Sequence, residues 1–290
     1  MDVFKAGSAR ELLLQATSEV LSRGQEISPR GQRTVELSPV TLVLYDPADC
    51  IPNGINRTKL HPPLGVVEGL QDVAGISTVD LTCRVAPNYG AFLNADGGLD
   101  GAYGPRLGKV LGAVWKKLHQ YPDTRQAMAA IWDAGDSLRT ASKDYPCTLG
   151  LHFLQRNGKL DLHVRMRSND LWWGTPYDIM QFCIVQLTMA NALRVEPGTY
   201  YHVANSLHLY ERDWEVAEAL YREPKETFDV RRLTGVGHDM SLGWEEKMER
   251  AQQLLAGLCP MDATATELYF AESLKPFMPD EVRVPSVRPV

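Results

Sequence analysis

The sequence lacks the features that would place the protein in a membrane or in an exported class. No run of residues approaches the ~20 apolar residues that a membrane-spanning helix needs, and no basic segment followed by an apolar one opens the chain. Positive charge is also scarce, since 30 Lys and Arg stand against 36 Asp and Glu, a formal charge of -6. We therefore expect no nucleic-acid polymer and no membrane as a partner, and an anionic ligand must be held by a few placed arginines.

Cysteine patterns for metal or disulfide frameworks are missing as well. The five cysteines are odd in number and scattered, without a CxxC pair or a Cys/His pair at zinc spacing. We expect no metal site and a reducing, cytoplasmic compartment. Internal repeats, low-complexity blocks and an interdomain linker are absent from the sequence too, which predicts a single domain over residues 1–290. With 44% hydrophobic and 23% charged residues, the composition is that of an ordinary globular protein.

Apolar residues at helical spacing predict several helices. They cover residues 8–23, 62–74, 110–120, the run after Pro176 and a shorter stretch from about 213 to 222. The run after Pro176 is apolar nearly all round, which is typical of a helix buried in the centre of a domain. Residues 88–108 contain many glycines and are predicted to form a loop with ligand contacts.

Alternating apolar residues predict strands between these helices. Residues 148–166 alternate on both sides of Asn157-Gly158, which is the pattern of a β-hairpin. β-Branched residues predict strands within 32–47, and a strand-like stretch covers 199–210. The tail from Pro276 onward is expected to be extended. Together these elements predict an α+β fold.

Cys147 is the cysteine with the most distinctive surroundings. It stands at the start of the first hairpin strand, and Arg167 follows the end of the second. The guanidinium can therefore approach the sulfur and favour the thiolate, which is the nucleophilic form. The spacing fits a buried structural cysteine equally well, so both readings stay open at this point.

Other polar residues have an ordinary explanation beside a functional one. Arg167 and Ser168 offer a guanidinium and a hydroxyl at a strand end, either an anion cradle or a polar turn. Asp178 opens the buried helix, where the helix dipole favours any carboxylate. Glu68 lies beside the apolar face of its helix, and His208 and Tyr210 alternate on one strand face, which suits a ligand hydroxyl or simple packing.

Taken in order, five motifs resemble the thymidylate synthase family. The nucleophile motif is matched by Tyr145-Pro-Cys-Thr148, and the phosphate and base site by Arg167-Ser-Asn-Asp-Leu-Trp-Trp-Gly-Thr-Pro-Tyr-Asp178. The sugar-hydroxyl pair is matched by His208-Leu-Tyr210, and the catalytic-glutamate helix by Glu68-Gly-Leu-Gln-Asp-Val-Ala-Gly75. The intersubunit phosphate segment is matched by Pro122-Asp-Thr-Arg-Gln126. The resemblance covers roughly residues 28 to 215, and the segment from about 216 is less recognisable. It implies a thymidylate synthase-like fold, with a large mixed or antiparallel sheet packed with helices around a long central buried helix.

The resemblance also implies roles for these residues. Cys147 would add to C6 of a pyrimidine nucleotide, and Glu68 would organise the proton transfers. The 5′-phosphate would be held by Arg167 and Ser168, by Arg30 or Arg33, and by Arg125 of the partner subunit, which implies a homodimer joined through the free face of the sheet. His208 and Tyr210 would contact the 3′-hydroxyl. The implied co-substrate is 5,10-methylenetetrahydrofolate, near Asp170, Gly174 and Tyr103.

Two departures from the family pattern bear on substrate and product. The family places Asn where this chain has Asp178, and a carboxyl group that shares a proton with N3 suits cytosine, as in the deoxycytidylate (cytidylate) 5-hydroxymethyltransferase branch. The segment LNADGGLDGAYG lacks the tryptophans that help hydride transfer in the family. A wetter pocket favours capture of the methylene group by water. Gln126 and Thr148 depart from the family pattern too, which leaves details of phosphate binding open.

The predicted reaction is therefore one-carbon transfer from the folate to C5 of a cytidine monophosphate, which gives the 5-hydroxymethyl nucleotide. Ser168 follows the deoxynucleotide enzymes, so dCMP is favoured with CMP close behind. Two alternatives are a divergent thymidylate synthase that methylates dUMP and a catalytically silent nucleotide- or RNA-binding relative. A thiol hydrolase is disfavoured, because no His and Asn or Asp accompany Cys147 at recognisable positions.

Overall fold

A mixed six-stranded sheet forms the centre of the molecule. The computed structural model describes residues 1–52, 61–219, 232–237 and 242–279. The strand order is β1-β4-β9-β7-β6-β5, with β1 and β4 parallel and β7 and β9 parallel. The strands are β1 (Asp2–Ala6), β4 (Val40–Leu44), β5 (Met128–Ala130), β6 (Thr148–Arg156), β7 (Lys159–Met166) and β9 (Glu196–Ala204). The α+β class and the mixed sheet are confirmed.

The predicted hairpin is β6 and β7, and its turn has the expected conformation. Asn157 and Gly158 have φ values of 51° and 75°, so both occupy the left-handed region that a two-residue hairpin turn requires. Leu151, Leu162 and Val164 on the inner face are completely buried. The hairpin thereby brings the start of β6 next to the end of β7, where Arg167 N–H donates to the Cys147 carbonyl.

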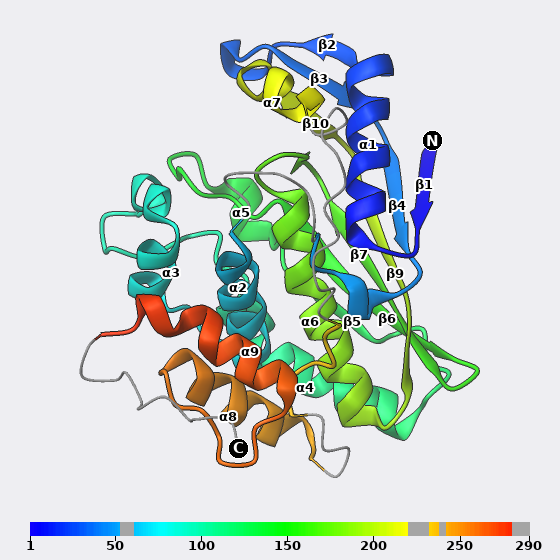
Figure 1. Cartoon of the computed structure of the whole chain (residues 1–290), viewed down its shortest axis with the longest axis vertical. Coiled ribbons are helices and arrows are strands. Elements are labelled where there is room, and N and C mark those ends of the chain that lie inside the picture. The colour runs from blue at the N-terminus through cyan, green and yellow to red at the C-terminus, as the bar shows by residue number, and fades with distance from the viewer. Residues whose placement is uncertain (53–60, 220–231, 238–241, 280–290) are drawn as a thin grey trace.

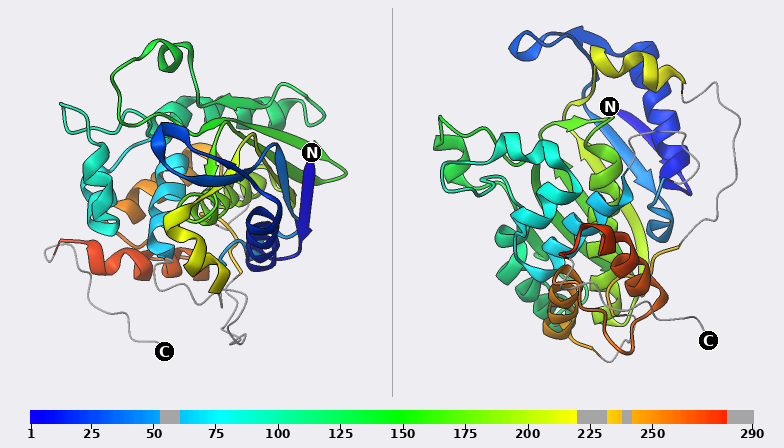
Figure 2. Two further views of the ribbon diagram at one scale, coloured as in Figure 1. Left: turned by 90° about the horizontal axis from the view of Figure 1, so that it is seen from above. Right: turned by 60° about the vertical axis from the view of Figure 1, so that its left-hand side comes forward.

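A smaller four-stranded sheet lies at the opposite end of the molecule from the C-terminal helices (Figures 1 and 2). Its order is β2-β3-β10-β8, from β2 (Gln25–Ile27), β3 (Thr34–Leu37), β8 (Asn169–Asp170) and β10 (Leu207–Tyr210). Helices α1 (Ala9–Arg23) and α7 (Trp214–Ala219) lie beside it. The predicted strand over 199–210 is wrong as one element, because Asn205 and Ser206 separate β9 in the large sheet from β10 in the small one.

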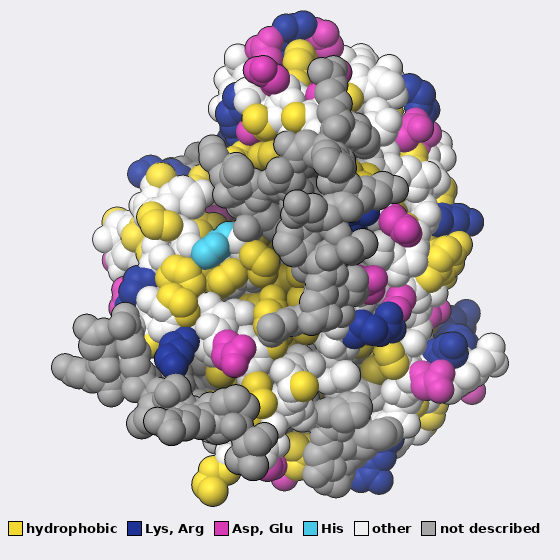
Figure 3. Space-filling view, viewed as in Figure 1, with side chains coloured by type: hydrophobic (Ala, Val, Ile, Leu, Met, Phe, Trp, Pro, Cys, Tyr) yellow, Lys and Arg dark blue, Asp and Glu magenta, His cyan; other side chains and the backbone are white. Residues whose placement is uncertain are grey.

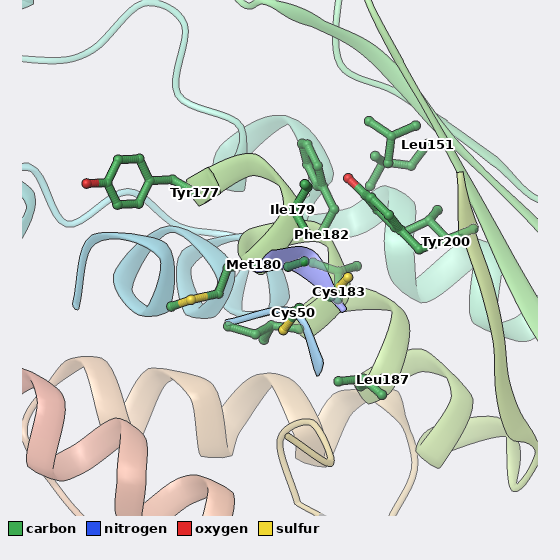
Figure 4. Close-up of a cluster of buried hydrophobic side chains, with 14 of the residues drawn as sticks. Cys50, Leu151, Tyr177, Ile179, Met180, Phe182, Cys183, Leu187 and Tyr200 are labelled. Carbon is green, nitrogen blue, oxygen red and sulfur yellow. The ribbon is translucent and has the colours of Figure 1, made fainter. Parts of the chain in front are cut away.

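Helix α6 (Thr175–Leu193) is the long buried helix that the sequence predicts. It packs against α2 (Pro62–Ala74), which has no side chain at two contact points: a Cβ on Gly65 would lie 2.9 Å from Met180, and one on Gly69 would lie 2.8 Å from Ile184. On the sheet side, Figure 4 shows Phe182 and Ile179 directed toward Tyr200 of β9. This close packing fixes the second and third turns of α6 against the first half of α2.

Helix α4 (Gly104–Gln120) begins earlier than the sequence predicts, so the expected loop over 88–108 is partly wrong. The glycines here allow close packing: a Cβ on Gly104 would lie 2.0 Å from the Ile76 carbonyl, and Gly108 packs against Gly75 at the end of α2. The earlier part of the segment holds a 3₁₀ helix at Pro87–Phe92, after α3 (Val79–Val85), and α5 (Ala134–Leu138) follows α4.

The C-terminal region adds two helices that the sequence analysis did not predict, α8 (Trp244–Leu255) and α9 (Ala265–Leu274). A 3₁₀ helix at Lys275–Phe277 replaces the expected extended start of the tail, Met278 is extended, and the tail from residue 280 lies outside the described residues. The end of the helix expected over 213–222 lies outside them as well. Within the described ranges, no helix has the length and apolar character needed to cross a membrane.

Candidate active site

The candidate residues gather around two adjoining depressions. The first, here called the inner cavity, lies between α2, the loop before α4 and the first turn of α6, and it is lined by acidic, amide and aromatic residues: Glu68, Gln71, Asp72, Tyr89, Tyr103, Cys147, Asn169, Asp170, Trp173, Gly174, Asp178 and Gln181, among others. The second, here called the outer cleft, is lined by Arg30, Glu36, Trp132, Arg167, Ser168, Ser206, His208 and Tyr210, among others. Tyr145 lines both. In the space-filling view, hydrophobic side chains gather over the region of α2 (Figure 3).

Cys147 stands where the inner cavity meets the outer cleft, directly before β6. Its Sγ lies 3.9 Å from the Arg167 guanidinium, and its backbone N–H donates to the Tyr103 hydroxyl at 3.2 Å. Arg167 is held in place because its Nε donates to the Pro146 carbonyl at 2.9 Å. The proximity of arginine and sulfur is as the sequence predicts.

The surroundings of Cys147 do not favour the thiolate. Burial raises the pKa of the Cys147 thiol from 9.0 to about 11, although the Arg167 guanidinium acts in the opposite direction. Removal of the sulfur from water destabilises the thiolate by more than the attraction of the exposed Arg167 cation stabilises it. Cys147 is therefore a protonated thiol at neutral pH until a ligand changes its surroundings.

Glu68 projects from α2 into the inner cavity as a proton-carrying group. The Tyr89 hydroxyl donates to its Oε1 at 2.5 Å, and burial raises the pKa of Glu68 to about 8 in spite of that hydrogen bond. One turn further on, Asp72 accepts a hydrogen bond of 2.8 Å from the Gln181 amide, and burial together with Glu68 raises the pKa of Asp72 well above its ordinary value. Glu68 and Asp72 thus hold protons at neutral pH.

Asp178 lies in the first turn of α6 and belongs to a buried polar network. The Asn169 side-chain N–H donates to Oδ2 of Asp178 at 2.7 Å. Burial raises the pKa of Asp178 to about 7, while the Asn169 hydrogen bond acts in the opposite direction. At neutral pH, this carboxyl group therefore exists in both protonation states in comparable amounts.

The outer cleft combines cations with hydroxyl and imidazole groups. Arg30 and Arg167 line it together with Ser168, and the rings of His208 and Tyr210 meet edge to face with centroids 5.2 Å apart. His208 and Tyr210 thus share one face of β10, as their spacing predicts. This arrangement can hold a phosphate group at one end and a hydroxyl group at the other.

Arg33, offered by the sequence beside Arg30, does not line the outer cleft. Its guanidinium donates to Glu26 and to Glu211, and it lies over the Trp214 ring at 4.9 Å. These two carboxylates and the aromatic ring hold the Arg33 side chain at the small sheet.

Arg125 lies on the exposed loop before β5 and lines neither depression.

The three residues expected near a folate all line the inner cavity. The Tyr103 hydroxyl accepts the N–H groups of Cys147 and Thr148 at 3.2 Å. Oδ1 of Asp170 accepts the N–H groups of Trp172 and Trp173, which fixes the turn that leads to Gly174. An aromatic wall with a carboxylate beside it suits a flat heterocycle that carries N–H donors.

Several residues of the site were not singled out in the sequence. Tyr89 lies in the segment predicted as a loop, and Asp72 and Gln181 are polar residues at core positions of α2 and α6. A polar residue in an apolar helix face is the signal that could have found the latter two. Asn169 belongs to the quoted Arg167–Asp178 motif, but its contact with His202, 33 residues further along the chain, had no signal in the sequence.

Comparison with known proteins agrees with this site. The thymidylate synthase family model matches residues 82–235. A deoxyuridylate hydroxymethyltransferase of Bacillus phage SP01 is 34% identical over 259 residues, which are 81% of this chain and 64% of that protein. A deoxyuridylate hydroxymethyltransferase of Pseudomonas phage M6 is 29% identical over 225 residues (73% and 62%), and a thymidylate synthase of Bacillus licheniformis is 32% identical over 128 residues (40% and 45%).

The family model covers more than half of the chain, and the chain belongs to the thymidylate synthase family. It spans just under two thirds of the length of the two phage proteins.

Proposed function

We propose that the protein transfers a one-carbon unit from 5,10-methylenetetrahydrofolate to C5 of a cytidine monophosphate and releases the 5-hydroxymethyl nucleotide. The observation that carries this proposal is Asp178, a carboxyl group with a pKa of about 7 in the wall of the inner cavity that Cys147 also lines. Cytosine offers an N4 amino donor and an N3 acceptor. A carboxyl group that shares one proton with N3 can satisfy both.

Cys147 is the proposed nucleophile. Its sulfur adds to C6 of the pyrimidine, which makes C5 electron-rich and able to attack the one-carbon group that the folate supplies. Glu68, with a pKa of about 8, holds a proton at neutral pH and can exchange it with the base or with water in the cavity. Loss of the C5 proton and of tetrahydrofolate then leaves an exocyclic methylene group on the nucleotide.

We propose that water adds to that methylene group and that the Cys147 sulfur then leaves C6, which releases the 5-hydroxymethyl nucleotide. The overall reaction balances as nucleotide, methylenetetrahydrofolate and water giving 5-hydroxymethyl nucleotide and tetrahydrofolate, without a hydride transfer. The lining supports this choice, because Glu68, Gln71, Asp72 and Gln181 place polar groups around the inner cavity. Such groups can bind an ordered water molecule.

In this proposal the outer cleft holds the 5′-phosphate and the sugar. Arg30, Arg167 and Ser168 would bind the phosphate, and His208 and Tyr210 the 3′-hydroxyl. Ser168 favours dCMP, with CMP close behind.

We also propose a homodimer in which Arg125 of the partner subunit completes the phosphate site. The outward face of the large sheet supports it, since His163 and Tyr201 stack there with ring centroids 4.4 Å apart and remain partly exposed in the single chain. Mixed dimers of Arg125→Ala and Cys147→Ser chains, each inactive alone, should recover about a quarter of the wild-type activity, because half of the dimers are mixed and each has one intact site. No recovery would contradict a shared site.

A second candidate is hydroxymethylation of deoxyuridylate, which is favoured by the printed names of the two phage relatives. A protonated Asp178 could accept from N3–H and donate to O4 of uracil. This candidate and the first differ only in the base and share every other residue role.

The test is tritium release from C5-labelled dCMP, CMP and dUMP with methylenetetrahydrofolate, followed by mass spectrometry of the product. Release from a cytidine nucleotide with a gain of CH2O supports the proposal. The matched variant Asp178→Asn should move the preference toward dUMP. Release from dUMP alone with a gain of CH2 would instead identify a methylating enzyme, and binding without release from any nucleotide would identify a silent relative.

A further inference from the structure

A chain of hydrogen bonds runs from Asp178, at the wall of the inner cavity, into the interior of the protein. Oδ1 of Asn169 is 2.8 Å from Nε2 of His202 and accepts the Thr175 hydroxyl at 2.7 Å. Nδ1 of His202 is 2.8 Å from the Tyr200 hydroxyl. Asn169, Thr175, His202 and Tyr200 are all at most 2% exposed. The chain joins β8 and α6 to the interior of β9.

The donor and acceptor roles along this chain follow from chemistry. Burial lowers the pKa of His202 to about 3, so its ring is neutral and carries one N–H. An amide oxygen can only accept, so Nε2 of His202 carries that hydrogen and Tyr200 donates to Nδ1. With its oxygen occupied by His202 and Thr175, Asn169 presents its N–H to Oδ2 of Asp178.

This contact makes the two oxygens of Asp178 unequal. Oδ2 already accepts the Asn169 N–H, so a carboxyl proton is more stable on Oδ1. A base that pairs with this group meets a donor at one oxygen and an acceptor at the other, in an order that the protein has set. Without the Asn169 contact, the proton could occupy either oxygen, and either order would be available to the base.

We infer that Asn169 is a positioning residue that sets the donor–acceptor order of Asp178 and so selects cytosine over uracil. The inference rests on the proposed function, in which N3 of cytosine meets Oδ1 and the N4 amino group meets Oδ2. Asn169 acts through Asp178, and its backbone N–H is engaged separately with the Ser206 carbonyl. The side-chain contact can therefore be removed without touching that backbone bond.

The test compares kcat/KM for dCMP and dUMP in wild type and in Asn169→Ala. The ratio of the two values should fall by roughly tenfold, which is the loss of one buried hydrogen bond. The alkaline limb of kcat/KM for dCMP should also move to higher pH, because the Asn169 N–H stabilises the Asp178 carboxylate. The other ionisable groups around this carboxyl are Glu68, Asp72, Tyr89, Tyr103, Cys147, Asp170 and Tyr200, and none of them is changed in the variant.

A matched control is Asn191→Ala at the far end of α6, where the side chain donates to the Thr234 carbonyl. This variant also removes a buried asparagine side chain, but one that does not contact Asp178. The base ratio and the pH limb should therefore stay within twofold of wild type. If Asn169→Ala does not fold, His202→Phe keeps the Asn169 N–H but releases its amide, and the base ratio should fall there too.

An unchanged base ratio in folded Asn169→Ala or His202→Phe, with only a loss of rate or stability, would overturn the inference. Failure of the proposed function is visible separately, because wild type would then prefer dUMP or release no tritium from a cytidine nucleotide. A dUMP preference that falls in Asn169→Ala would retain the positioning role and reverse the assigned base. A dUMP preference that does not fall would overturn both.

Discussion

The protonated state of Cys147 gives the most direct prediction. With a pKa of about 11 in place of 9.0, the thiolate fraction at about pH 8 falls from roughly 9% to roughly 0.1%. The higher pKa makes the remaining thiolate more nucleophilic toward disulfides by roughly 6- to 10-fold. The two effects leave Cys147 reacting about tenfold more slowly than an ordinary exposed thiol.

The assay is the rate of reaction with an aromatic disulfide reagent, taken as the difference between wild type and Cys147→Ser so that the other cysteines cancel. The logarithm of the rate should rise in proportion to pH from about pH 7 to about pH 9.5 without a plateau. Arg167→Met should slow the reaction further, because the cation 3.9 Å away is lost, whereas Arg167→Lys keeps the charge and serves as the control. A plateau by about pH 8.5, or equal rates in the two Arg167 variants, would refute the reasoning.

Three further predictions concern binding and stability. Arg30→Ala should raise the KM for the nucleotide by roughly tenfold through loss of a charge-assisted phosphate contact, whereas steady-state kinetics of Arg33→Ala should stay within twofold of wild type. Arg250→Met should lower the free energy of unfolding in urea by about 3–5 kcal/mol, because it leaves the fully buried Glu267 carboxylate without its cationic partner. The pKa of Glu267 is lowered in the folded protein, so this contribution is present above pH 4.5 and is lost as the pH falls, a dependence that the variant should lack. Gly158→Ala, at φ +75°, should cost about 1 kcal/mol in the same assay.

Local chemistry made much of the fold predictable from the sequence. Ser8 caps α1 by accepting the Glu11 N–H, Gly75 ends α2 in the left-handed conformation, and Asn157-Gly158 turns the hairpin. Each of these signals depends on neighbours within four residues. The same holds for α6, whose all-round apolar sequence predicts burial wherever the rest of the chain lies.

Tertiary contacts explain the parts that could not be predicted. The sequence predicts a loop at Gly104, and only the structure shows that the glycine allows close packing against the Ile76 carbonyl. The sequence also offers Arg33 as a phosphate ligand, and only the structure shows that it pairs with Glu211, far along the chain. The site behaved in the same way. The motif residues came from the sequence, whereas the burial that raises the pKa of Glu68 and of Asp178, and the hydrogen bonds from Tyr89 and Asn169 that oppose it, required the structure.

The site separates fixed charge from exchangeable protons. Arg30 and Arg167 bring guanidinium groups to the outer cleft, which suits a phosphate. In the inner cavity, burial raises the pKa of Glu68 to about 8 and of Asp178 to about 7, so these acids present donors as well as acceptors to a neutral base. Uracil and cytosine differ in the position of one donor, so in the proposed function the location of a single proton on Asp178 decides between them. The pH dependence of the dCMP-to-dUMP ratio therefore reports on the base-selecting group directly, because the phosphate and sugar contacts are the same for both nucleotides.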